Sequence, residues 1–157
     1  MPDAAARLIA ALPLPERVAA DLLRNPAYAA LIEQAGHGAD PAADPHAWAA
    51  FQQRLAEALH AEKRDVEALA LAQGAHSTWQ AHLPPGAEEL GRSGALVASV
   101  LIALAQYEEA RLWAVESIAV HQAHHPQADL ERARRTRLLA RALAKLGALT
   151  QAEALFV

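Results

Sequence analysis

Four basic side chains near the carboxyl end of the chain are spaced to lie on one face of a helix. They are Arg134, Arg137, Arg141 and Lys145, at offsets of 3, 4 and 4 along the sequence. Because successive residues of an α-helix turn by about 100°, all four fall within one arc. Guanidinium groups donate paired hydrogen bonds to carboxylates and phosphates, so the stripe predicts an acidic peptide, a C-terminal carboxylate or a phosphorylated segment as the ligand.

The same basic stripe has two further interpretations. A charged helix face is often simply solvated, and here Asp129, Glu131 or another helix could neutralise it. Nucleic acid is the other alternative, but the formal net charge of the chain is −4 and no aromatic residues alternate with the arginines. An acidic protein segment and a solvated face therefore remain open, and nucleic acid is disfavoured.

Histidines and one carboxylate form the weak candidates for a metal site. His121 and His125 are one helical turn apart, as a zinc or nickel site requires, although cationic residues also suit helix C-termini. Glu57 and His60 have the Glu-x-x-His spacing of one half of a di-iron site, but the chain holds no second copy of that motif. We expect no metal and no other cofactor.

Motifs for catalysis and for membrane insertion are missing from the sequence. The chain has no cysteine, no glycine-rich phosphate loop and no H-E-x-x-H motif, so we expect that the protein is not an enzyme. Its longest apolar stretch, 95–105, is much shorter than the roughly 20 residues that span a bilayer. Asp3, Pro13 and Pro15 do not fit a secretory signal. A cytoplasmic protein without a membrane segment is expected.

The composition and the positions of proline and glycine predict an all-α fold in one domain. Alanine and leucine dominate, and β-branched and aromatic residues are too sparse for strands. Prolines and glycines divide the chain into segments of helical length, and the short connections imply antiparallel neighbours. The expected helices cover 3–12, 15–24, 26–36, 46–62, 65–81, 87–104, 107–123, 128–146 and a segment from 149.

The sequence contains an internal repeat: one constant offset along the chain aligns Ala56 with Ala98 and Ala98 with Ala140. The junctions Gln-Ala-His-Leu-Pro at 80–84 and Gln-Ala-His-His-Pro at 122–126 coincide under this shift, and so do alanines that would let paired helices approach closely. Leu112 and Val115 are expected to belong to the apolar face around these alanines. The aligned alanines are Ala56, Ala98 and Ala140, and then Ala68, Ala110 and Ala152.

The carboxyl-terminal part of the chain resembles tetratricopeptide repeats of the 42-residue kinesin-light-chain type. The resemblance covers LVASVLIALAQYEEARLWAVESIAVHQAHHP and, after it, LLARALAKLGALTQAEALF. The small and aromatic positions of that family are filled by Ala98, Ala105, Tyr107 and Ala110, and again by Ala140, Gly147, Leu149 and Ala152. The resemblance implies a right-handed superhelix whose concave face, lined by the first helix of each pair, binds peptides. It also implies that Arg92 occupies the groove position of Arg134, one repeat earlier.

The expected organisation places three repeats after an N-terminal segment. Residues 1–40 form a possible cap, and the repeats cover 46–84, 87–126 and an incomplete 128–157. The expected function is a non-enzymatic scaffold that binds a partner protein in its groove. A domain of a longer protein that self-assembles through the helix from residue 149 is the alternative, followed by a histidine-based metal-binding bundle.

Overall fold

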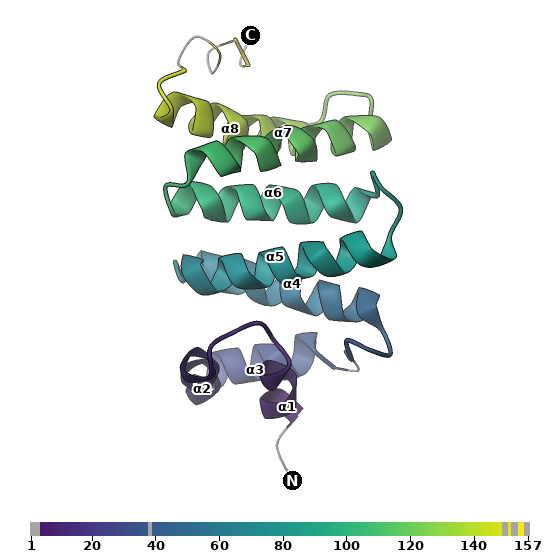
Figure 1. Cartoon of the computed structure of the whole chain (residues 1–157), viewed down its shortest axis with the longest axis vertical. Coiled ribbons are helices and arrows are strands. Elements are labelled where there is room, and N and C mark those ends of the chain that lie inside the picture. The colour runs from purple at the N-terminus through teal and green to yellow at the C-terminus, as the bar shows by residue number, and fades with distance from the viewer. Residues whose placement is uncertain (1–3, 38, 149–150, 152–153, 156–157) are drawn as a thin grey trace. The chain divides into compact units, whose positions relative to one another are not determined.

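Every regular element in the described part of the chain is a helix (Figure 1). The computed structural model describes residues 4–37, 39–148, 151 and 154–155. An isolated bridge between Asp40 and Asp44 is the only β feature within these ranges. The prediction of an all-α fold is confirmed. The helices are α1 (Ala4–Ala10), α2 (Glu16–Arg24), α3 (Pro26–Ala35), α4 (Pro45–Ala61), α5 (Asp65–His82), α6 (Glu88–Ala103), α7 (Tyr107–His124) and α8 (Leu130–Lys145).

Two helices begin at an Asn-Pro or Asp-Pro pair. The Asn25 side chain accepts a hydrogen bond from the Ala27 N–H at 3.0 Å, and Asp44 accepts one from the Ala47 N–H at 3.1 Å. The proline that follows each cap lacks an N–H, so its place in the first turn leaves no donor unpaired. These pairs fix where α3 and α4 start.

The turns after α4, α6 and α8 are one structure that recurs at the interval of the sequence repeat. Each contains a residue with positive φ: 62° at Lys63, 61° at Ala105 and 83° at Gly147. In each turn, the N–H of the residue after the one with positive φ donates to the carbonyl five residues earlier, at 2.8–2.9 Å. This hydrogen bond ends the helix as in a Schellman motif. The bonded pairs are Arg64–Leu59, Gln106–Leu101 and Ala148–Leu143.

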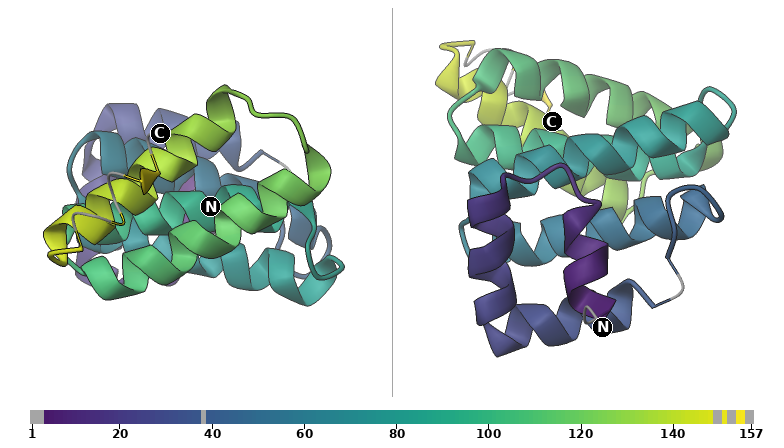
Figure 2. Two further views of the ribbon diagram at one scale, coloured as in Figure 1. Left: turned by 90° about the horizontal axis from the view of Figure 1, so that it is seen from above. Right: turned by 60° about the horizontal axis from the view of Figure 1, so that its bottom comes forward.

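The chain forms two compact units, Met1–His82 and Leu83–Val157. In the first unit, α1, α2 and α3 contact one another, α3 also contacts α4, and α4 pairs with α5 (Figure 2). Large apolar side chains from these helices are fully buried and form its core. They include Leu22, Ile32, Phe51, Leu55, Leu59 and Leu71.

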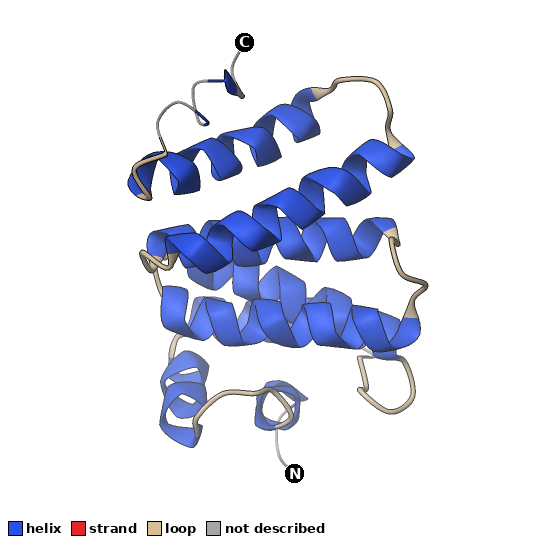
Figure 3. Cartoon of the chain, turned by 45° about the horizontal axis from the view of Figure 1, so that its top comes forward, coloured by secondary structure: helices blue, strands red, loops and turns tan. Residues whose placement is uncertain are grey.

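In the second unit, α6 contacts both α7 and α8, and α7 and α8 also pack together (Figure 3). Its core is built around small residues, among them Ala98, Ala110 and Ala114. The expectation that Leu112 and Val115 belong to the helix-packing face is wrong, because both are exposed and lie outside the arc of α7 that carries the buried alanines. The described helices lack the combination of length and apolarity that a membrane crossing needs. The helix expected from 149 lies largely outside the described residues.

Candidate functional site

The basic stripe occupies the outward face of α8. The buried face of this helix carries Leu139, Ala142 and Leu143, and it packs against α6 and α7. The residues at the other side of the helix are solvent-exposed, as the spacing predicts. We call Arg134, Arg137, Arg141 and Lys145 the basic face.

Most of the basic face has no counter-charge. Arg134 lies 3.8 Å from the carboxylate of Glu131. No carboxylate of the described residues forms an ion pair with Arg137, Arg141 or Lys145. Neutralisation within the described part of the chain is therefore limited to the first arginine, and three neighbouring cations remain uncompensated. Repulsion at such spacing costs only tenths of a kcal/mol, about 0.2–0.5 per pair, so the fold tolerates it.

Arg92 lies on α6 in the same unit and is also exposed. Its guanidinium makes no hydrogen bond or ion pair with the described residues. It lines a pocket of about 320 Å³ together with Glu131, the carboxylate partner of Arg134. The structure thus brings Arg92 to the end of α8 at which the basic face begins.

A further arginine of α8, which the sequence analysis did not single out, is buried. Arg135 is 4% exposed; its Nε donates to Glu131 at 2.9 Å, and its Nη1 donates to the Ser117 carbonyl at 2.8 Å. A Cβ on Gly91 would lie 3.0 Å from Arg135 Nη1, so the absence of a side chain there makes room for the guanidinium. Arg135 therefore fixes α8 against α7 and holds Glu131 in place.

Position within the helix is the signal that could have identified Arg135. It precedes Leu139 by four residues and Ala142 by seven, so all three share the core-facing side of the helix. The exposed arginines fall on the other arc. A charged residue in the register of the apolar face, one turn from its own carboxylate, predicts a buried structural pair.

His121 connects the end of α7 with the start of α8. Its Nε2 lies 2.9 Å from both carboxylate oxygens of Asp129, which also caps α8 by accepting the Arg132 N–H at 2.8 Å. The hydrogen bond from Arg132 and, after it, the one from His121 lower the pKa of the Asp129 carboxyl below its ordinary value. The helix start is thus held by an ionised cap.

The other two histidines at this end of α7 bind the start of α6. His124 donates to the Gly86 carbonyl at 2.7 Å, and His125 pairs with Glu88. The hydrogen bond from His125 is the main reason why the pKa of Glu88 is lowered. The histidine cluster therefore ties together three helix ends within the second unit.

The metal candidates all have protein partners. Among the described residues, no three side chains of the metal-ligating types converge on one point. His121 and His125 do lie together, with ring centroids 4.7 Å apart, but each is bonded to a carboxylate. In the first unit, Glu57 accepts a hydrogen bond from Gln53 at 3.3 Å and His60 lies 2.6 Å from Asp65.

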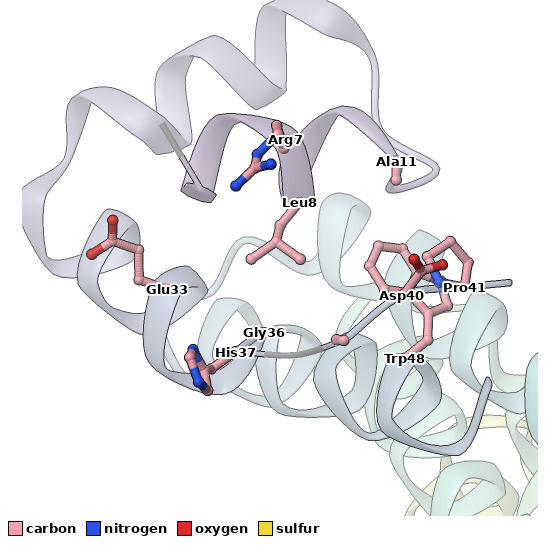
Figure 4. A pocket seen from close by; sticks show the side chains of 10 residues that line it. Arg7, Leu8, Ala11, Glu33, Gly36, His37, Asp40, Pro41 and Trp48 are labelled. Carbon is pink, nitrogen blue, oxygen red and sulfur yellow. The ribbon is translucent and has the colours of Figure 1, made fainter. Parts of the chain in front are cut away.

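A larger pocket, of about 530 Å³, lies in the first unit (Figure 4). It has apolar walls from Leu8 and Trp48, with Arg7, Glu33 and Asp40 among its charged lining residues. The Asp40 side chain caps the turn that follows it, since its Oδ1 accepts hydrogen bonds from two backbone N–H groups at 2.8 and 3.2 Å. The described lining residues carry both signs of charge, from Arg7 to Glu33 and Asp40.

Comparison with known proteins adds no assignment. No protein-family model matches the chain, and no curated protein is significantly similar to it. The functional conclusion therefore depends on the geometry of α6, α7 and α8.

Proposed function

We propose that the chain is a non-enzymatic interaction module that binds an acidic segment of a partner protein along the basic face of α8. The observation that carries the proposal is the exposure of Arg137, Arg141 and Lys145 without a carboxylate partner among the described residues. An acidic ligand would supply the missing counter-charges. Electrostatic complementarity of this kind favours rapid and selective association.

The dimensions of the basic face suit a short segment. From Arg134 to Lys145 the helix rises by about 16 Å, at about 1.5 Å per residue. An extended peptide covers that length with about five residues. Arg135 and the α6–α7–α8 core hold the helix in place before the ligand arrives, so little ordering entropy is lost by the protein on binding.

The tetratricopeptide resemblance supports the same proposal. The turns that end α4, α6 and α8 recur at the interval of the sequence repeat, and α6 contacts both its own partner helix α7 and the next first helix α8. In a tetratricopeptide stack, first helices line the groove; the resemblance would make α6 and α8, which carry Arg92 and the basic face, first helices. The superhelical groove, the scaffold role and a cytoplasmic setting are parts of this proposal.

The test is binding of a fluorescent poly-glutamate peptide, followed by anisotropy at low and high salt. We expect the double variant R137E/R141E to lose at least about tenfold in affinity, because like charges then face the ligand. Circular dichroism should show an unchanged fold, since both positions are exposed.

The matched control is R17E/R54E, which reverses two exposed arginines of the first unit that form no ion pair with the described residues. It changes the net charge by the same amount and should leave binding unaltered. Equal losses in both double variants would show that only net charge matters, and the proposal would then be abandoned. The same conclusion would follow from an absence of binding by the wild type at low salt.

A further inference from the structure

The outward face of α7 combines apolar and acidic side chains. Leu112 is 56% exposed and Val115 is 46% exposed. Glu109 and Glu116 lie beside them, are exposed, and form no ion pair with a basic side chain among the described residues. We call these four residues the acidic face of α7. Its unpaired charges are negative, whereas the unpaired charges on the basic face of α8 are positive.

The two faces have matching spacing. On α7, Glu109, Leu112 and Glu116 follow one another at offsets of 3 and 4 along the sequence. On α8, Arg134, Arg137 and Arg141 do the same. Residues at these offsets form a stripe along a helix, so Glu109 and Glu116 can each face an arginine of the other stripe when the two helices lie side by side.

Apolar contacts are available as well as ionic ones. Leu130, at the start of the basic face, is 67% exposed, and Leu138 beside Arg137 is half-buried. These side chains offer apolar surface to Leu112 and Val115. A contact of mixed character would therefore bury leucine and valine at its centre and place the ion pairs around them.

The two faces cannot meet within one copy of the chain. The buried side of α7, which includes Ala114 and Ser117, packs on α6 and α8. The buried side of α8, which includes Leu139 and Ala142, packs on α6 and α7. Both charged faces thus point outward from a shared core.

We propose that the acidic face of α7 in one copy docks on the basic face of α8 in a second copy. This inference depends on the proposed function, because it names the acidic segment bound there as α7 of another chain. The contact joins two different surfaces, so it either closes reciprocally into a two-fold dimer, with each copy supplying both faces, or continues into rings and open chains. High salt weakens it, because its ion pairs are at the surface.

The test is sedimentation velocity over a wide range of concentration, at low and high salt. Wild-type protein should associate at low salt and dissociate at high salt. R137E/R141E and E109R/E116R should each associate at least about tenfold more weakly, because each places like charges across the contact. An equimolar mixture of the two variants should recover association, since opposite charges then face each other again. The chain carrying all four substitutions should recover it alone.

The mixing result separates a specific contact from general charge repulsion. If the mixture remains monomeric, the docking of α7 on α8 is overturned even though each variant lost association. A wild-type chain that stays monomeric at low salt overturns it directly.

The poly-glutamate titration distinguishes this outcome from failure of the proposed function. Peptide binding by a monomeric wild type leaves the module intact and rejects only the second copy as its partner. Self-association that the peptide displaces supports both proposals. If neither ligand nor self-association is found, both are rejected.

Discussion

The helices of the α4–α5 pair and of the α6–α7 pair have nearly the same lengths, but the side chains between them differ. When the first pair is shifted by the interval of the sequence repeat, its helix ends nearly coincide with those of the second pair. In the first pair, Trp79 donates from its indole nitrogen to Gln53 at 3.4 Å, so α5 is bonded to α4. The equivalent residue of the second pair is His121, which is bonded to Asp129 before α8. Local turns thus set the helix ends, while individual side chains decide which neighbour a pair binds.

At two aligned positions, the pairs differ in which helix carries the larger side chain. Phe51 of α4 is 1% exposed, and the equivalent residue of α6 is the small Ser93. Conversely, Leu71 of α5 is replaced in α7 by Trp113, whose ring lies 3.6 Å from where a Cβ on Gly94 would be. Volume lost from one helix is supplied by the other, as close packing requires.

The largest effect is expected from removing the bulk of the first pair. Phe51→Ala should lower the free energy of unfolding by about 3–5 kcal/mol, because it leaves a cavity in a buried site. Urea unfolding followed by circular dichroism measures the change. Ser93→Ala removes a hydroxyl that donates to the Leu90 carbonyl at 3.3 Å, among other contacts, and should cost about 0.5–1.5 kcal/mol. Similar losses in the two variants would refute the assignment of bulk to α4.

A smaller effect is expected from the contact that directs the second pair towards α8. Arg135→Met keeps much of the side-chain volume but removes the hydrogen bonds to Glu131 and Ser117. We expect a loss of about 1.5–3 kcal/mol, the range for hydrogen bonds made by charged groups. Arg137→Met, two residues further along the same helix, should stay within about 0.5 kcal/mol of wild type.

Differential scanning calorimetry together with the poly-glutamate titration separates effects on folding from effects on binding in these two variants. Arg137→Met should weaken poly-glutamate binding at unchanged stability. Arg135→Met should lower the unfolding temperature. A reversal of these two patterns would mean that the exposed and buried arginines have been assigned to the wrong roles.

The positions and ends of the eight described helices could be predicted from the sequence because they depend on local features, while the ninth expected helix lies largely outside the described residues. Proline, glycine and capping residues act within a few positions, and the expected boundaries of 46–62 and 107–123 differ little from the observed α4 and α7. Exposure of the basic face also followed from helical periodicity alone. The buried Arg135 was missed because the exposed arginines of the same helix mask a single cation on the opposite arc.

Contacts between distant residues could not be predicted in the same way. The bond from Trp79 to Gln53 and the pairing of His125 with Glu88 join residues 26 and 37 positions apart. His121 and His125 have metal-ligand spacing, and only their neighbours in space show that both are paired with carboxylates. Leu112 and Val115 were placed on the packing face because they are apolar, although helical register puts them outside the arc that carries Ala110 and Ala114.

The repeated turn offers a comparison at the scale of single backbone positions. Lys63 and Ala105 adopt positive φ, where a Cβ is unfavourable, while Gly147 adopts it freely. Lys63→Gly and Ala105→Gly should each stabilise by about 1 kcal/mol, and Gly147→Ala should destabilise by about the same amount. No atom of the described residues lies within 4 Å of a Cβ built on Gly147, so the substitution mainly reports backbone strain. Unfolding temperatures that do not change in opposite directions would contradict a shared turn.

The smallest effect distinguishes the helix caps of the two units; it is present at neutral pH and is lost in acid. The lowered pKa of Asp129 means that its carboxylate stabilises the fold above the ordinary carboxyl pKa of about 4, and that this stability is lost as pH falls through the lowered value. Asp129→Asn keeps a capping oxygen but cannot ionise, so it should be less stable than wild type at neutral pH and equal to it in strong acid. Asp44, which caps α4 without a histidine partner among the described residues, provides the control. Urea titrations from neutral to acid pH should therefore show a larger pH-dependent difference for Asp129→Asn than for Asp44→Asn, and equal differences would mean that His121 contributes nothing to the cap.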